Sequence, residues 1–378
     1  MPRRSLDARA SLKIAVIGHI RHPIAAPFQG GMEAHCHQLV RALERRGHDV
    51  TLFAAGGSDA RTLVPVCEMP YEESLPWSRW HGTDRLRDFQ RRAFARARSA
   101  IARGGFDVVH NNSLSIDVID WAREDGTAMV TSQHVPPFAA MRAVVDRACK
   151  SSGQVFTVTS ADQLQLWNRN VGDSMHVVSN GIDMARWPRA RVRGDRLVWF
   201  GRIAPTKGLR EAVAAVRAAG ARLDIVGMKE DAEYFDEHVR PFLGEDIRYH
   251  GHLSGNALHA IVSRSRAALV TPMWDEPFGL VAAEAMAAGV PVIAFDRGAM
   301  REVLGDCGRI VPAGDIAALA EAIREAGELD GNACRERVRQ RFSVDRMIDG
   351  YEAAYRQAMS GSEAARSSSH SRTAALLA

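Results

Sequence analysis

The chain lacks the features that mark a metal ribbon, a disulfide scaffold or a membrane span. Its five cysteines are dispersed and include no Cys-x-x-Cys pair, which argues against a zinc ribbon and a disulfide framework. No run reaches the ~18 consecutive apolar residues of a membrane helix, and the charged start lacks the apolar segment of a signal peptide. Reduced, unpaired thiols are typical of a cytosolic protein, so we expect a cytoplasmic location.

Lysine is also scarce. Only four of the 49 basic residues are lysines, namely Lys13, Lys150, Lys207 and Lys229. A lysine at a chemically sensitive position is therefore a candidate functional residue. The 45 acidic residues leave a net charge of +4, which is too small to indicate a nucleic-acid partner.

The hydrophobic pattern predicts two α/β domains in series. A length of 378 residues with 46% hydrophobic and 25% charged residues fits two globular cores. Continuous apolar strands separated by helical segments favour parallel sheets covered on both faces. The pattern restarts at Leu197, after a segment at 180–195 that is rich in Gly, Pro and Arg. Strands are expected at 12–17, 49–55, 108–109, 129–131, 155–159 and 175–178, and then at 197–200, 222–226, 247–249, 267–270 and 290–295.

The strongest chemical signal is a pair of glutamates, Glu276 and Glu284, after the strand at 267–270. Pro277 and Gly279 predict a tight entry into a helix, which would place the carboxylates roughly 12 Å apart along its axis. That spacing is too long for a two-carboxylate hydrolase but suits the length of a sugar nucleotide, whose diphosphate would face the first helical amides. The alternative is a helix cap and a solvated charge, but the small and apolar neighbours of Glu284 disfavour it.

A second signal follows the strand at 197–200, where Arg202 and Lys207 bracket a proline turn. A guanidinium fork and a compact ammonium together suit a diphosphate whose leaving charge must be neutralised. Two exposed cations in an ordinary strand-to-helix loop are the alternative.

Two weaker signals lie in the first half. Gly30 and Gly31 would let the backbone approach a phosphate or a sugar closely, although they form neither a dinucleotide fingerprint nor a Walker loop. His134 ends the strand at 129–131 and could bond a sugar hydroxyl. The alternative for the two glycines is a simple turn. The alternative for His134 is a loop histidine whose hydrogen bonds are made within the protein.

Residues 12–358 together resemble the nucleotide-sugar-dependent glycosyltransferases with two Rossmann-like domains facing a central cleft, the GT-B fold, and within them the retaining family 4 enzymes. The E-x7-E motif from Glu276 to Glu284 carries this resemblance most specifically. The segments 288–294 and 298–302, the Gly201-Arg202 and Lys207-Gly208 pairs, the hinge 180–183 and the Gly30-Gly31 loop also match.

The resemblance implies a role for each candidate residue. Arg202 and Lys207 would bind the donor diphosphate, and Glu284 the ribose. Glu276 would hold the donor sugar beside His134, and a metal or other cofactor would not be required. The backbone amides that would assist Glu276 belong to Phe278, Gly279, Leu280 and Val281.

The resemblance also implies a separate role for each domain. Residues 1–182 would form an acceptor-side domain, in which the loops at 68–81 and 111–115 contact the acceptor. Residues 183–342 would form a donor-binding domain. A helix at 343–360, whose apolar positions recur at helical spacing, would cross back to the first domain. Residues 361–378 would form a disordered tail. Donor, acceptor and oligomeric state are left open by the sequence.

Two further patterns have competing explanations. Residues 84–103 form a basic amphipathic helix, which would either lie weakly on the inner face of an anionic membrane or cover the first sheet. His35-Cys36-His37 looks metal-like, but adjacent positions diverge around a helix, so we do not expect a metal site there.

Two other functions are compatible with the same two-domain pattern. A nucleotide-sugar epimerase would form products without any acceptor. A non-catalytic sugar- or nucleotide-binding protein would bind ligands without turning them over, because a fold does not prove an activity.

Overall fold

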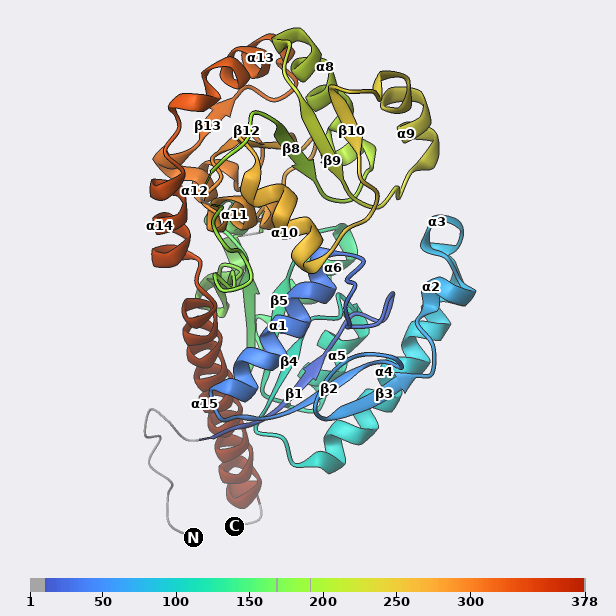
Figure 1. The fold of residues 1–378 in the computed structure, drawn as a ribbon. Coiled ribbons are helices and arrows are strands. Elements are labelled where there is room, and N and C mark those ends of the chain that lie inside the picture. Colours follow the sequence, from blue (N-terminus) through green and yellow to red (C-terminus); the bar gives the residue numbers. More distant parts are fainter. Residues whose placement is uncertain (1–10, 168, 191, 377–378) are drawn as a thin grey trace. The chain divides into compact units, whose positions relative to one another are not determined.

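The computed structural model describes residues 11–167, 169–190 and 192–376, which form two α/β units (Figure 1). Unit 1 contains Met1–Val158, Trp167–His176 and Ile348–Ala378, and unit 2 contains Thr159–Leu166 and Val177–Met347. The sequence predicted a single boundary at residue 182 followed by one returning helix. In the structure the chain also enters unit 2 earlier, at 159–166, because the turn after the sixth strand bonds to the loop around Pro277.

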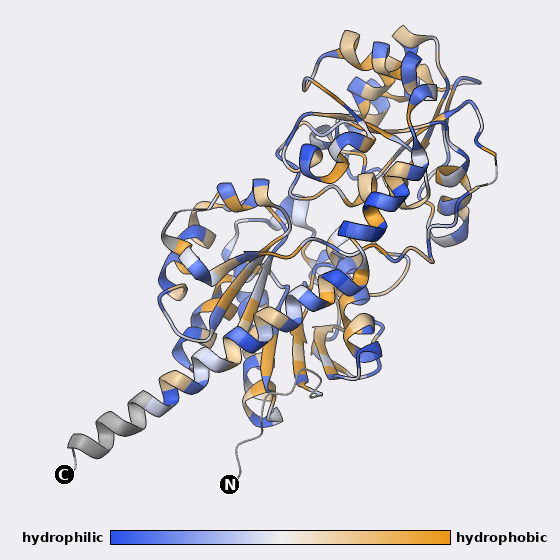
Figure 2. Cartoon of the chain, turned by 90° about the vertical axis from the view of Figure 1, so that its left-hand side faces the viewer, coloured by the Kyte–Doolittle hydropathy of each residue, from blue (hydrophilic) through white to orange (hydrophobic). Residues whose placement is uncertain are grey.

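Unit 1 is built on a seven-stranded sheet with the order β3-β2-β1-β4-β5-β6-β7. The pairs from β3 to β6 are parallel, as the continuous apolar strands predict. Its strands are β1 (Lys13–Ile17), β2 (Asp49–Ala55), β3 (Leu63–Cys67), β4 (Val108–Asn111), β5 (Met129–Gln133), β6 (Gln154–Val158) and β7 (Met175–Val177). In Figure 2 these strands are coloured mainly as hydrophobic, whereas the helices around them carry both colours.

The helices of unit 1 include the basic amphipathic helix predicted near residues 84–103. They are α1 (Gly31–Arg45), α2 (Tyr71–Ser74), α3 (Trp77–Trp80), α4 (Asp84–Gly104), α5 (Ile116–Glu124), α6 (Ala139–Ala148) and the 3-10 helix η1 (Arg169–Ser174). Leu86, Phe94 and Ile101 of α4 are buried in a hydrophobic cluster with strands β1 and β2. The apolar stripe of this helix therefore covers the sheet, and only its polar side is left to face a membrane.

Unit 2 is built on a six-stranded parallel sheet with the order β10-β9-β8-β11-β12-β13. Its strands are β8 (Leu197–Phe200), β9 (Leu223–Val226), β10 (Ile247–Tyr249), β11 (Ala268–Val270), β12 (Val292–Phe295) and β13 (Arg309–Val311). Along β8, Val198 and Phe200 belong to one core cluster and Leu197 and Trp199 to another. Because side chains alternate along a strand, the sheet is covered on both faces.

Most helices of unit 2 lie between its strands in sequence, whereas α7 precedes the first strand of the sheet and α13, η5 and α14 follow the last. The α-helices are α7 (Ala161–Gln165), α8 (Leu209–Ala219), α9 (Ala232–His238), α10 (Gly255–Arg264), α11 (Leu280–Ala287), α12 (Met300–Leu304), α13 (Ile316–Arg324) and α14 (Gly331–Arg341). The 3-10 helices are η2 (Pro205–Lys207), η3 (Arg240–Phe242), η4 (Gly305–Cys307) and η5 (Glu325–Glu328). Helices α11 and α14 contribute to one core cluster, and α8 and α13 to the other.

The last helix, α15 (Val344–Leu376), begins in unit 2 and continues in unit 1. Its apolar positions are buried, as helical spacing requires: Met347, Ile348, Tyr351, Ala354, Tyr355 and Ala358 are each at most 3% exposed. Residues 361–376, for which the sequence predicted a disordered tail, continue this helix. Ser362 Oγ donates a hydrogen bond of 2.8 Å to the carbonyl of Gly126, which anchors the continuation.

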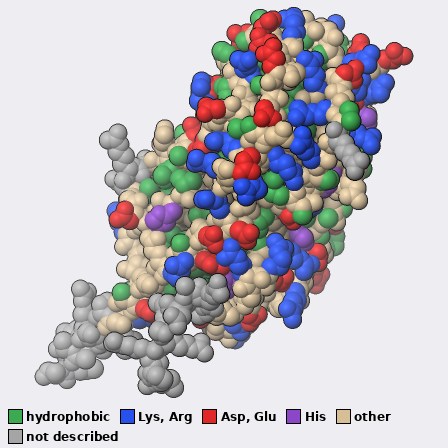
Figure 3. Space-filling model, turned by 60° about the vertical axis from the view of Figure 1, so that its left-hand side comes forward, with side chains coloured by type: hydrophobic (Ala, Val, Ile, Leu, Met, Phe, Trp, Pro, Cys, Tyr) green, Lys and Arg blue, Asp and Glu red, His purple; other side chains and the backbone are tan. Residues whose placement is uncertain are grey.

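One face of the molecule shows interspersed charges, and the described helices include no membrane span. On the face drawn in Figure 3, acidic and basic side chains are interspersed. None of the helices in the described part of the chain combines the length and the apolar content that crossing a bilayer requires.

Candidate active site

The centre of the candidate site in unit 2 is an ion pair between Lys207 and Glu276. Lys207 ends η2, just after β8, and Glu276 lies in the loop after the neighbouring strand β11. The Lys207 Nζ lies 2.6 Å from Glu276 Oε2. The indole Nε1 of Trp274 donates to the same oxygen at 2.8 Å, and the Lys207 ammonium lies 5.0 Å from the Trp274 ring centroid. Two of the predicted site residues, far apart in sequence, are thus in direct contact.

Backbone contacts hold the Lys207 loop against the end of β11. Gly208 has a φ of +66°, and a Cβ on it would lie 1.9 Å from the carbonyl oxygen of Thr271. The Thr271 hydroxyl donates to the Gly208 carbonyl at 2.8 Å, and the Met273 amide donates to the Thr206 carbonyl at 2.9 Å. Glycine at 208 is therefore required for the approach that brings Lys207 to Glu276.

The segment around Glu276 is fixed from two sides within unit 2. The Ala299 amide donates to the Glu276 carbonyl at 2.9 Å, and a Cβ on Gly298 would lie 2.4 Å from both the nitrogen and the carbonyl oxygen of Glu276. The next carbonyl, that of Pro277, accepts hydrogen bonds from Thr159 Oγ1 at 2.9 Å and Ser160 Oγ at 2.7 Å. Glu276 is consequently presented by a rigid backbone.

Helix α11 begins later than the sequence predicted. The prediction placed Glu276 at the helix mouth, but α11 starts at Leu280, after Gly279 in the left-handed region with a φ of +85°. Pro277 and Gly279 form the turn itself, so Glu276 belongs to the preceding loop. The 12 Å estimate assumed a continuous helix between the carboxylates and does not apply. The first amides of α11, including those of Leu280 and Val281, have no intrahelical acceptor and suit an anion.

Glu284 lies inside α11 among the buried alanines that precede and follow it, and its own side chain is partly buried. This burial raises the pKa of Glu284 to about 7, against the opposing effect of the positive charge on Arg186. At neutral pH the carboxyl is thus divided between its protonated and ionised forms. The sequence demanded a partner for this carboxylate, and Arg186 supplies a positive charge that acts on it.

Arg202, after β8, is engaged by an acidic residue that no sequence pattern indicated. One guanidinium nitrogen lies 2.9 Å from both carboxylate oxygens of Glu230, and the Arg202 side chain is 41% exposed. Both cations of the predicted diphosphate site are therefore paired with carboxylates in this structure.

Phe278, before the start of α11, is buried in the core of unit 2, and the other predicted residues belong to unit 1. Gly30 is the N-cap of α1, in an extended conformation, and Gly31 opens the helix. His134 follows β5, and its Nε2 lies 2.7 Å from Asn112 Oδ1. Burial lowers the pKa of His134 to about 4, so its imidazole is neutral at physiological pH.

Sequence reasoning missed the residues that support the site. Trp274 lies within the motif segment, and its indole N–H is a signal that could have been used. Arg186, Glu230, Thr159 and Ser160 left none, because their partners lie between 28 and 118 positions away.

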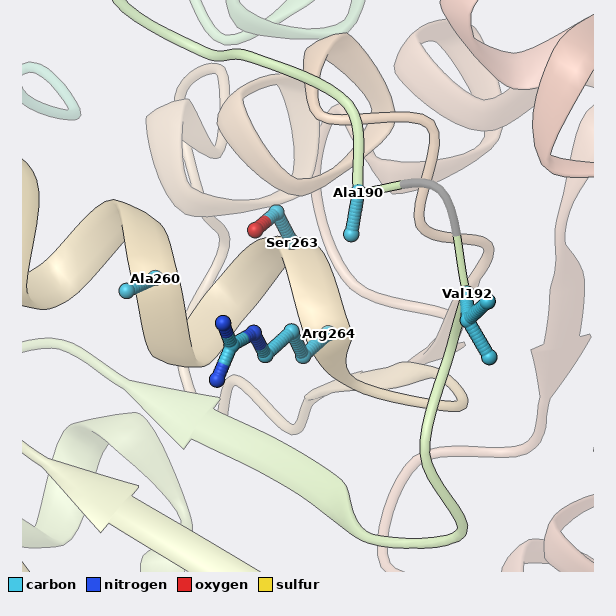
Figure 4. A pocket seen from close by; sticks show the side chains of 5 residues that line it. All are labelled: Ala190, Val192, Ala260, Ser263 and Arg264. Atoms are coloured by element: carbon cyan, nitrogen blue, oxygen red, sulfur yellow. The ribbon is translucent and has the colours of Figure 1, made fainter.

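The side chains of the metal-like sequence at 35–37 diverge, as expected for adjacent positions of a helix. His35 is 4% exposed, whereas His37 bonds at 3.1 Å to the exposed side chain of Asp59. Among the residues that the structure describes, no group of three or more His, Cys, Asp or Glu side chains is arranged to hold a metal ion. One pocket of about 440 Å³ in unit 2 (Figure 4) is lined by Ala190, Val192, Ala260, Ser263 and Arg264, none of them a predicted site residue.

Comparison with known proteins shows the same family in both parts of the chain. Residues 29–186 match the model described as "Glycosyltransferase Family 4", and residues 194–328 match the model described as "Glycosyl transferases group 1". The chain is 28% identical to a glycogen synthase of Mycobacterium tuberculosis, over 84% of this chain and 87% of that protein. It is 27% identical to the D-inositol 3-phosphate glycosyltransferase of Mycolicibacterium smegmatis, over 95% and 94%.

Solved structures agree with this assignment. AviGT4, a glycosyltransferase involved in avilamycin A biosynthesis, is 25% identical and superposes with a TM-score of 0.71 over 93% of this chain and 98% of its own. HepE from Anabaena, solved with UDP-glucose, shares the fold with a TM-score of 0.67 at 17% identity, over 90% of this chain and 100% of its own. With its two parallel α/β sheets and the E-x7-E motif, the chain belongs to the glycosyltransferases of the family 4 type, with the GT-B fold.

Proposed function

We propose that this glycosyltransferase takes a hexosyl group from a nucleoside-diphosphate sugar and transfers it, with retention of the anomeric configuration, to an acceptor. The observation that carries the proposal is the contact between Lys207 and Glu276 beside the start of α11. A cation and free helix amides suit a diphosphate, and a carboxylate can accept hydrogen bonds from the hydroxyls of the attached sugar.

Unit 2 supplies the donor-binding groups in this proposal. The diphosphate displaces Glu276 from the Lys207 ammonium and Glu230 from the Arg202 guanidinium. The first amides of α11 bind its remaining oxygens. Glu276, released from Lys207, then accepts hydrogen bonds from the sugar hydroxyls, and Glu284 accepts them from the ribose. HepE, which has the same fold, has been solved with UDP-glucose, and this supports a donor of that class.

The chemistry is electrostatic. As the bond between the sugar and the phosphate breaks, negative charge builds on the leaving diphosphate, and the two cations and the helix amides stabilise it. Unit 1 supplies His134, which is neutral at physiological pH and contacts the donor sugar in this proposal, while the loops at 68–81 and 111–115 hold the acceptor. We further propose that the reaction requires no metal ion and takes place in the cytoplasm.

Retention is proposed on the strength of the family 4 resemblance and can be tested directly. Wild-type protein is incubated with a panel of nucleoside-diphosphate sugars and sugar or polyol acceptors, and nucleotide release and the anomeric proton of the product are followed by NMR. We expect release with one donor class and a product with the anomeric configuration of the donor. Glu276→Gln should reduce turnover by about 100-fold or more, because it removes a charge from the reacting centre.

The same experiment separates the alternatives. A product with the inverted anomeric configuration would overturn the proposed retention, but it would still show transferase activity. An epimerase would form a new sugar nucleotide without acceptor. Absence of nucleotide release with every donor and acceptor, alongside measurable donor binding, would instead indicate a non-catalytic binding protein.

A further inference from the structure

A chain of buried hydrogen bonds runs through unit 1 behind His134. It starts at Tyr355 on α15, whose hydroxyl lies 2.6 Å from His110 Nδ1, and continues from His110 Nε2 to Ser132 Oγ at 2.8 Å. His110 lies on β4 and Ser132 on β5, at the position two residues before His134. Tyr355 and His110 are fully buried and Ser132 is 2% exposed. The chain therefore links the last helix to the strand that ends at His134.

A second tyrosine of α15 extends the chain to the other face of His134. Ser132 Oγ donates to Tyr351 Oη at 3.3 Å, and Tyr351 Oη lies 3.4 Å from His35 Nε2 on α1. The His35 ring packs against the His134 ring, with a centroid distance of 4.5 Å and an interplanar angle of 58°. On its far side, His134 Nε2 bonds to Asn112 Oδ1 at 2.7 Å. The imidazole is thus held between an amide and a second imidazole.

The proton positions follow from the partners. Burial raises the pKa of Tyr351 to about 12 and that of Tyr355 well above its usual value, so both hydroxyls keep their protons. Burial lowers the pKa of His110 to about 3, so that ring is neutral with one N–H. If Tyr355 donates to His110 Nδ1, the His110 proton is on Nε2 and points to Ser132. Ser132 Oγ donates to Tyr351, and Thr157 Oγ1, 2.9 Å from Ser132 Oγ, then donates to Ser132.

The chain then ends at His35. If Tyr351 in turn donates to His35 Nε2, the His35 proton is on Nδ1. That nitrogen is buried and has no hydrogen-bond partner among the described residues, a costly arrangement for a fold to keep. Apolar groups of the same shape can replace both partners of a buried hydrogen bond at little cost in stability. The cost of the arrangement points to a role other than stability.

We propose that Tyr351 and Tyr355 of α15 are positioning residues for His134, acting through His110, Ser132 and His35. The two tyrosines fix one tautomer for His110 and one for His35. They thereby fix the orientation of the His35 ring, which packs on His134. Because His134 contacts the donor sugar in the proposed reaction, the inference rests on that proposal for its effect on turnover. The tautomers and the ring orientation stand independently of it.

The test is NMR of the full-length protein labelled with 15N at histidine, which reports which ring nitrogen carries the proton. At pH 7 the wild type should show Nε2–H for His110 and His134 and Nδ1–H for His35, each assigned by substitution. In Tyr355→Phe and Tyr351→Phe the His134 ring signals should shift and the single tautomer of His110 or His35 should be lost. Tyr234→Phe, which deletes a hydroxyl that accepts from the Arg210 amide in unit 2, should leave all three histidines unchanged.

Unchanged His134 signals in both tyrosine variants would overturn the proposal, as would Nδ1–H for His110 in the wild type. Should a tyrosine variant fail to fold, Ser132→Ala interrupts the same chain with a smaller change and is read in the same way. With a working donor, Tyr355→Phe should lower kcat by about five-fold, the worth of roughly one hydrogen bond, while the donor KM changes less than two-fold. A wild type that turns over no donor would refute the proposed function. The NMR result would still decide whether Tyr351 and Tyr355 position His134.

Discussion

At the scale of single residues, the site depends on charges that are already paired before a ligand arrives. Lys207 contacts Glu276 and Arg202 contacts Glu230, so neither cation is exposed to solvent as an isolated charge. Such pairing keeps the side chains ordered, and in the proposed reaction a diphosphate would only have to replace the carboxylates rather than to organise the cations. The scarcity of lysine pointed to Lys207, but its partner became visible only in three dimensions.

Glu284 should make donor binding depend on pH. Its pKa of about 7 means that roughly a tenth of the carboxyl is ionised at pH 6 and nine tenths at pH 8. If the ionised form alone accepts the ribose hydroxyls, donor affinity should rise by up to about ten-fold between these values. Calorimetric titration at both pH values measures this rise, and Glu284→Gln should abolish it.

The same raised pKa predicts an effect of opposite sign on stability. Between the usual pKa of a glutamate and about 7, the folded chain binds the proton of Glu284 more tightly than the unfolded chain does. The contribution of this group is therefore present at low pH and is lost as the pH rises through about 7. Relative to wild type, Glu284→Gln should be more stable at pH 8 than at pH 5, and an equal difference at both would contradict the assignment.

At the scale of elements, the loops after β8, β11 and β12 create the site, and glycines allow them to meet. Gly298 illustrates this, since its φ is +56° and its hydrogen lies against the backbone of Glu276. A methyl group there would collide with main-chain atoms that cannot rotate away.

Gly298→Ala should therefore displace Glu276 as well as strain the backbone. Gly314→Ala is the matched control, because Gly314 also has a positive φ, +79°, but nothing lies within 4 Å of the point that an added methyl group would occupy. We expect the control to lose about 1–2 kcal/mol of unfolding free energy in a urea titration and to bind donor normally. Gly298→Ala should lose more stability and its donor affinity. Equal losses in the two variants would show that the contact with Glu276 has no consequence.

How far the sequence predicted these elements depended on length and burial. The long apolar strands and α15 were predicted because their periodicity extends over many residues. Strands β3 and β13 were missed, since β3 contains Pro65 at the edge of its sheet and β13, at the edge of the other sheet, buries only Val311 fully. The start of α11 was placed too early because Glu276 was taken as the helix mouth, whereas Gly279 adopts a left-handed conformation that sequence alone does not specify. The ion pairs and the Tyr–His chain join residues far apart in sequence, which no local pattern reveals.

At the scale of the whole molecule, α15 connects the two units, and its tyrosines lie in the polar core of unit 1. The three neutral imidazoles of that core make stability sensitive to acid. Burial lowers the pKa of His35, His110 and His134, so below about pH 6.5 the unfolded chain takes up protons that the folded chain does not. Stability should thus fall as the pH falls from 6.5 towards 4.

Thermal unfolding between pH 7.5 and 4.5 measures this loss. His110→Gln, which removes one titrating group, should show a shallower decline of the melting temperature than wild type. His238→Gln in unit 2, a partly exposed histidine, is the control and should decline like wild type. A His110→Gln profile parallel to wild type would contradict the account of a neutral buried imidazole.

The central claim is that unit 2 binds a nucleoside-diphosphate sugar through Lys207 and its neighbours. Calorimetric titration of the full chain with UDP-, GDP- and ADP-sugars tests it most directly, with Lys207→Ala as the site variant and Lys150→Ala, an exposed lysine of unit 1, as the control. The account predicts that one donor binds wild type and Lys150→Ala with equal affinity and Lys207→Ala at least about ten-fold more weakly, because one charge-assisted phosphate contact is lost. Binding of every donor with equal affinity to wild type and Lys207→Ala, or of none to wild type, would contradict it.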